Sequence, residues 1–94
     1  PLSDRACQNA KPKAKIYKLS DDKGLYLEVK PMGGRYWRLK YRLDGKEKRL
    51  AFGVYPEVSL LEAREKRDAA RKLIADGIDP QEAAREQREE RALK

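Results

Sequence analysis

Alternating apolar and polar residues between positions 25 and 54 predict the strands of an antiparallel sheet. Every second residue of two runs is apolar: Leu25, Leu27 and Val29 in the first, and Trp37, Leu39, Tyr41 and Leu43 in the second. Asp44-Gly45 follows the second run and is a favoured hairpin turn, because both of its residues need a positive φ. We therefore expect a third strand over residues 46–54, and we allow a short extra strand around residues 16–19.

The hairpin also predicts its own register. The expected pairs are Leu43 with Lys46, Arg42 with Glu47, Lys40 with Arg49, Leu39 with Leu50, and Trp37 with Phe52. In this register apolar residues meet apolar residues, and Arg42 meets a carboxylate. The loop before the second run must then have an odd length, three or five residues, to keep the first run on the face of Trp37.

Cap residues and prolines predict the helices. Ser3 is a helix N-cap, and Pro12 stops that short helix by residue 10 or 11. Ser59-Leu60-Leu61-Glu62 fits a capping box, and the helix after it carries a stripe of small alanines that lets it lie close against the sheet. Asp79-Pro80 starts a last helix that is almost wholly polar, which indicates a connector.

Together these elements predict an α+β fold. We expect a three-stranded antiparallel sheet, with a short extra strand allowed, packed on one face by an α-helix. A short N-terminal helix and a C-terminal connector helix complete the fold. A chain of 94 residues has interior for one core, so we place one domain at residues 1–78 and a helical linker at residues 79–94.

Positive charge is concentrated on the segment predicted to form the sheet. Residues 11–55 carry 13 Lys and Arg against 5 Asp and Glu, whereas residues 56–94 carry 9 against 10. A one-sided basic surface attracts a polyanion, and nucleic acid is the common one. No apolar run suggests a signal peptide or a membrane span, and a single cysteine, Cys7, suits a reducing cytoplasm.

The candidate binding residues lie on the sheet face opposite Trp37: Tyr26, Tyr36, Arg38, Lys40, Arg42 and Arg49. Lys40 and Arg49 fall opposite each other, and like charges so placed repel unless a phosphate lies between them. The tyrosines add planar donors for phosphates or bases. The alternative is a merely solvated sheet face, but such a face mixes signs, and only Glu28 and Glu47 oppose this basic set.

The residue types in this chain do not indicate a catalytic site. The chain has no histidine and one cysteine, so the usual nucleophile–base and zinc arrangements lack parts. Gly33-Gly34 is better explained by a turn than by a phosphate-binding loop. We expect neither a metal ion nor a cofactor.

Several runs of the chain resemble the N-terminal domain of prophage and genomic-island integrases, which are tyrosine recombinases. The resembling runs are Lys18-Leu19-Ser20-Asp21, Gly24-Leu25-Tyr26-Leu27-Glu28-Val29, Gly34-Arg35-Tyr36-Trp37-Arg38, Leu50-Ala51-Phe52-Gly53-Val54-Tyr55-Pro56 and Gly77-Ile78-Asp79-Pro80. The resemblance covers roughly residues 2–83. It implies a non-catalytic arm-type DNA-binding domain, whose linker leads toward a separate core-binding and catalytic region.

The resemblance also implies a setting and partners. We expect sequence-specific binding of double-stranded DNA at accessory sites during integration and excision of a mobile element, with the sheet in the major groove. Other integrase protomers and accessory DNA-bending or excision factors are the expected protein partners, in the bacterial cytoplasm at the nucleoid and away from membranes. An RNA-binding or protein-interaction module of the same fold is the alternative, and a hydrolase is a distant third.

Overall fold

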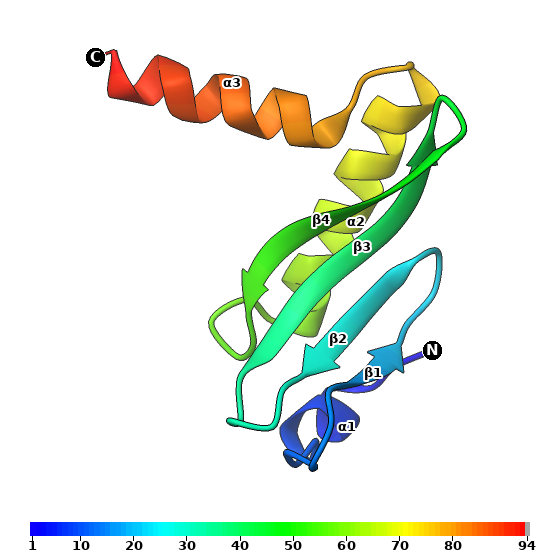
Figure 1. The fold of residues 1–94 in the computed structure, drawn as a ribbon, viewed down its shortest axis with the longest axis vertical. Helices are drawn as coiled ribbons and strands as arrows, with labels where there is room; N and C mark the ends of the chain where they lie inside the picture. The colour runs from blue at the N-terminus through cyan, green and yellow to red at the C-terminus, as the bar shows by residue number, and fades with distance from the viewer. Residues whose placement is uncertain (94) are drawn as a thin grey trace.

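The structure, a computed structural model, describes residues 1–93 as a four-stranded sheet with three helices. The elements follow in the order α1 (Asp4–Gln8), β1 (Tyr17–Ser20), β2 (Leu25–Val29), β3 (Arg35–Leu43), β4 (Lys46–Val54), α2 (Leu60–Ala75) and α3 (Pro80–Ala92). The antiparallel strands lie in the order β1-β2-β3-β4, and α2 crosses one face of the sheet (Figure 1). The α+β class is confirmed. The sheet has four strands rather than three, because the allowed extra strand pairs along its whole length with β2.

The register follows the prediction from the hairpin turn as far as Leu39 opposite Leu50. The loop between β2 and β3 has five residues, the odd length required, and Leu27 consequently pairs with Trp37. The predicted pair of Trp37 with Phe52 is wrong, because a β-bulge shifts the register and Trp37 pairs with Gly53. The bulge depends on Gly53, whose φ of +118° is strained for a residue with a side chain.

The core lies between the sheet and α2. Trp37 is fully buried there, with its indole N–H donating to the Val58 carbonyl at 2.7 Å. Ala63 is also fully buried, and its small side chain lets α2 approach the sheet. The predicted capping box at the start of α2 is present, since Ser59 and Glu62 exchange both hydrogen bonds.

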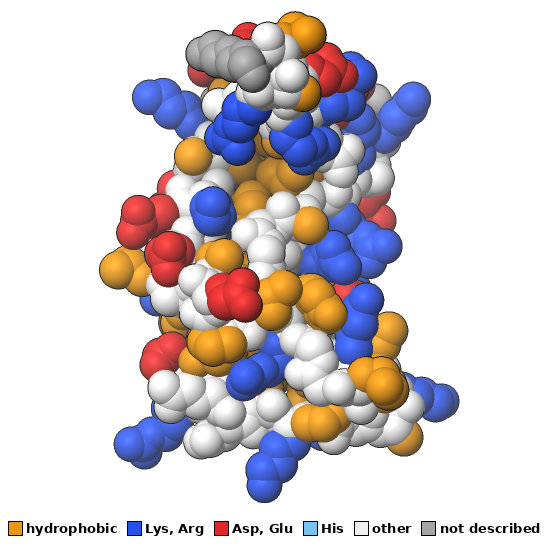
Figure 2. Space-filling view, turned by 90° about the vertical axis from the view of Figure 1, so that its left-hand side faces the viewer, with side chains coloured by type: hydrophobic (Ala, Val, Ile, Leu, Met, Phe, Trp, Pro, Cys, Tyr) orange, Lys and Arg blue, Asp and Glu red, His pale blue; other side chains and the backbone are white. Residues whose placement is uncertain are grey.

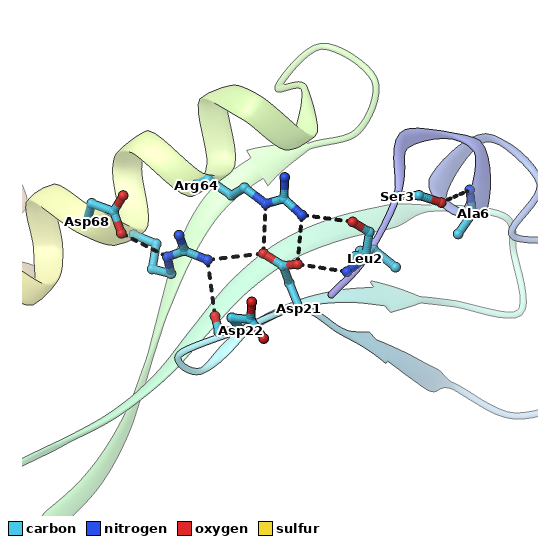
Figure 3. A network of polar contacts seen from close by, with 8 residues as sticks. Leu2, Ser3, Ala6, Asp21, Asp22, Arg64 and Asp68 are labelled. Carbon is cyan, nitrogen blue, oxygen red and sulfur yellow. Dashed lines mark hydrogen bonds and ion pairs between the residues drawn. The ribbon is translucent and has the colours of Figure 1, made fainter.

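A buried ion network fixes the β1–β2 turn to α2 (Figure 3). The Asp21 carboxylate, 1% exposed, accepts two hydrogen bonds of 2.9 Å from Arg64 and one of 3.0 Å from Arg67. The Leu2 amide donates a further bond of 2.8 Å to the same carboxylate. Hydrogen bonding by Arg64 is the main cause that lowers the Asp21 pKa well below its usual range. The network therefore holds β1, the N-terminus and α2 in one arrangement.

The last helix, α3, is attached to the β3–β4 hairpin before it runs away from the sheet (Figure 1). Asp79 caps α3 and accepts hydrogen bonds from the Tyr41 hydroxyl at 2.6 Å and the Lys48 ammonium at 2.5 Å. The Gln81 side chain donates to the Arg49 carbonyl. The predicted linker at 79–94 remains a prediction, and its last residue, Lys94, lies outside the described residues. No helix within residues 1–93 is both long enough and apolar enough to cross a membrane.

Candidate nucleic-acid interface

The sheet face turned away from α2 carries a basic surface from all four strands. By the strand register, its members are Lys18, Ser20, Tyr26, Glu28, Tyr36, Arg38, Lys40, Arg42, Glu47, Arg49 and Ala51. The edge-on view of Figure 2 shows a group of Lys and Arg side chains at the middle of its right-hand side, and several Asp and Glu side chains on the left. We call this set the basic face. It contains all six residues selected from the sequence.

Arg38 is held on the basic face by a buried carboxylate. Its Nε donates to Glu28 at 3.3 Å, and the Glu28 side chain is only 9% exposed. Because a buried carboxylate needs a partner, this ion pair is part of the fold as well as part of the surface. The bond to Glu28 uses Nε and not the outer nitrogens of the guanidinium.

Tyr36 is partly buried between two cations. The Lys30 ammonium lies 4.7 Å from the centre of its ring, and the Arg38 guanidinium lies 5.9 Å from it. The ring packs over Gly34, where a Cβ would come within 2.5 Å of it. The absence of a side chain at Gly34 thus lets the Tyr36 ring approach the loop closely, with two cations near the ring.

Lys40 and Arg49 pair directly across β3 and β4, as the register predicted. Glu47 forms an ion pair of 2.9 Å with Lys40 diagonally, rather than with its opposite residue Arg42. Arg42 instead donates to the Gly45 carbonyl of its own turn at 3.3 Å. The repulsion between Lys40 and Arg49 is therefore relieved from one side by an exposed carboxylate.

Tyr26 shares the basic face but is not the exposed donor that the alternation suggested. It is 5% exposed, and the Lys18 ammonium covers its ring at 4.8 Å. The Arg49 guanidinium lies near the Tyr26 hydroxyl, which raises the Arg49 pKa, although the geometry falls short of a hydrogen bond. Long side chains from the two edge strands therefore cover the middle of the sheet.

Sequence reasoning did not select Lys18 and Lys30. The register places Lys18 opposite Glu28, on the basic face, and Lys30 stacks on the Tyr36 ring. The alternation in β1 signals the orientation of Lys18, but only once β1 is known to pair with β2. Lys30 lies in a loop, where no periodicity indicates a direction.

Other reactive groups do not form a second site. Burial is the main cause that raises the pKa of the Cys7 thiol to about 11, so the thiol stays protonated at neutral pH. Within residues 1–93, no cluster of three or more His, Cys, Asp or Glu side chains could hold a metal ion.

Several phage and prophage integrases are similar to this chain. A family model described as an arm DNA-binding domain matches residues 2–87. The integrase of Enterobacteria phage P4 is 55% identical over 91 residues, 95% of this chain and 21% of that protein. The integrase of Shigella phage Sf6 is 50% identical over 87% of this chain and 21% of that protein. Prophage integrase IntZ of Escherichia coli (strain K12) is 46% identical over 94% of this chain. The chain spans about a fifth of the length of these relatives.

Proposed function

The chain belongs to the arm DNA-binding domain family of phage and prophage integrases, and we propose that it binds double-stranded DNA at accessory, arm-type sites during integration and excision. The longer protein is then an integrase of the tyrosine recombinase type. Other integrase protomers and accessory DNA-bending or excision factors act with it at the nucleoid. Residues 79–94 lead from this domain toward the core-binding and catalytic regions.

The observation that carries the proposal is the basic face. Three of the four strands, β1, β3 and β4, contribute cations to it, while the opposite face is covered by α2. A sheet fits into the major groove of B-DNA, where each base pair presents a distinct pattern of donors and acceptors. Arg38 is suited to contact a base. Glu28 restrains its guanidinium through Nε alone, so the two outer nitrogens are not used by that bond. Bidentate recognition of guanine needs two guanidinium nitrogens.

Selection from a pool of random duplexes, followed by methylation interference, tests the groove and the sequence preference together. We expect an enriched motif in which methylation of guanine N7, in the major groove, blocks binding. Methylation of adenine N3, in the minor groove, should have little effect. Interference confined to adenine N3 would refute the major-groove arrangement, and a pool without enrichment would refute sequence-specific recognition.

Competition between nucleic acids separates the proposal from an RNA-binding module of the same fold. At one fixed salt concentration, unlabelled duplex DNA should displace labelled duplex DNA better than duplex RNA or single strands. The reason is that A-form RNA has a deep, narrow major groove that a sheet cannot enter. Equal or better competition by RNA would favour the alternative.

A further inference from the structure

Tyr26 carries a buried hydroxyl that has no hydrogen-bond partner within residues 1–93. The residue is 5% exposed, and its ring lies beneath the Lys18 ammonium at 4.8 Å. A phenylalanine would fill the same space without burying an unsatisfied polar atom, so the hydroxyl costs the free protein stability. The presence of this hydroxyl is explained if it gains a hydrogen-bond partner when the protein forms a complex.

Three cations lie around Tyr26 on the basic face. Lys18, Lys40 and Arg49 together line a hollow of about 270 Å³. The residues that line a second hollow of about 240 Å³ include Lys18, Lys40 and Tyr26, together with Asp21, whose carboxylate is buried in its own ion network. A water molecule occupies about 30 Å³, so each hollow has room for a phosphate group. Lys18 and Lys40 line both hollows, so the two hollows lie next to each other.

An exposed carboxylate already lies beside these cations. Glu47 lines the larger hollow and pairs with Lys40 at 2.9 Å, with both side chains more than half exposed. The hydrogen bond from Lys40 is the main cause that holds the Glu47 pKa below its usual value, and the charges of Arg42 and then Lys18 lower it further. An exposed ion pair of this kind stabilises a fold very little, so another anion can replace the carboxylate at small cost.

Building on the proposed function, we propose that the basic face holds one site for a phosphate of the DNA backbone, formed by Lys18, Lys40, Arg49 and the Tyr26 hydroxyl. In the free protein the Glu47 carboxylate takes the place of that phosphate beside Lys40. When DNA binds, the phosphate displaces Glu47, and the exposed Lys18 and Arg49 side chains turn toward the phosphate, Lys18 leaving the Tyr26 ring. The Tyr26 hydroxyl then donates to a phosphate oxygen.

Three variants of the 94-residue chain, each with a matched control, test this site by anisotropy with a labelled random-sequence duplex of about 25 base pairs across a salt series. Tyr26→Phe is compared with Tyr17→Phe, whose hydroxyl donates to the Lys11 carbonyl. Lys18→Ala is compared with Lys72→Ala, and Glu47→Gln with Glu65→Gln. Both of those control positions are exposed residues of α2. Thermal unfolding of every variant is measured alongside.

The expected effects differ in kind. Tyr26→Phe should weaken binding about tenfold at every salt concentration while its unfolding midpoint stays level or rises, because a hydrogen bond to a charged group is lost only in the complex. Lys18→Ala should reduce the slope of log affinity against log salt by about 0.9, the contribution of one phosphate. Glu47→Gln should bind more tightly than Glu65→Gln, although both remove one negative charge.

The outcomes separate the two proposals. If the unaltered chain does not bind duplex DNA even at low salt, the proposed function fails and this site fails with it. If the unaltered chain binds but Tyr26→Phe equals Tyr17→Phe, or Lys18→Ala keeps the full salt slope, only the phosphate site is refuted. Equal affinities for Glu47→Gln and Glu65→Gln would show that Glu47 does not take the place of the phosphate.

Discussion

Replacing Asp21 by asparagine should destabilise the domain more than almost any other single polar change. The substitution removes the negative charge from a carboxylate that is 1% exposed and leaves Arg67, whose side chain is 9% exposed, without its buried partner. Breaking a buried ion pair from one side costs about 3–5 kcal/mol. Asparagine can still accept hydrogen bonds from Arg64 and the Leu2 amide. We therefore expect a loss of unfolding free energy at the lower end of this range, about 3 kcal/mol. The total free energy of unfolding of a small domain is about 5–15 kcal/mol.

Urea unfolding followed by the fluorescence of Trp37 measures this loss. Trp37 is the only tryptophan and is fully buried in the folded protein, so its emission reports exposure of the core. At a slope of about 1.5 kcal/mol per molar urea, a loss of about 3 kcal/mol lowers the midpoint by about 2 M. Asp22→Asn is the matched control, because it removes one charge from the neighbouring exposed position of the same turn.

Lowering the pH should destabilise the protein by protonating the same carboxylate, that of Asp21. Hydrogen bonding by Arg64 lowers the Asp21 pKa in the folded state, below the value of about 3.9 in an unfolded chain. Its contribution is therefore fully present above about pH 5 and is lost as the pH falls through about 4 and below. The unaltered chain should lose more stability on acidification than Asp21→Asn does. Equal urea midpoints near neutral pH, or parallel losses in acid, would refute the assignment of Asp21 as the anchor of the turn.

Three further substitutions separate stability from binding. Arg42→Ala should weaken duplex binding about tenfold, about 1.4 kcal/mol, and leave the free energy of unfolding within about 0.5 kcal/mol because the side chain is exposed. Unchanged anisotropy curves would remove Arg42 from the interface. Arg38→Ala should lower affinity and also cost about 1–3 kcal/mol of stability, since Glu28 stays buried without its partner; full stability in urea would contradict this. Gly53→Ala should cost more than about 1 kcal/mol, because of its φ of +118° and a new Cβ 2.8 Å from Val58. A thermal midpoint equal to that of the unaltered chain would disprove the need for glycine there.

Local patterns in the sequence predicted most of the sheet and the caps. The period of two and the Asp44-Gly45 turn predicted β4 with the bounds that the structure shows, and the capping box placed the start of α2. The bulge at Phe52 could not be predicted in this way, since it inserts one residue without breaking the apolar pattern. The partners of Asp21 were also out of reach, because Arg67 lies 46 residues away and meets it only through the packing of α2.

For the candidate site, too, the sequence predicted which face a side chain lies on but not how deeply it is buried. Alternation assigned Tyr26 to the basic face correctly, because successive side chains of a strand point to opposite faces. It could not show that the ring is buried on that face, since Lys18 of β1 covers the ring and Arg49 of β4 lies near the hydroxyl. Periodicity gives the side of a strand on which a residue lies, while burial depends on neighbours from other strands.

The two carboxylates of the basic face differ in what a bound polyanion can do to them. Glu28 is 9% exposed, so its ion pair with Arg38 must persist when DNA binds. Glu47 is more than half exposed, so its contact with Lys40 can be exchanged for another anion at little cost. Arg38 is therefore held by a buried anion, whereas Lys40 is paired with an exposed one. A count of charges alone would treat Arg38 and Lys40 as equivalent. Their partners differ in exposure, so the two cations differ in how easily their ion pairs are exchanged.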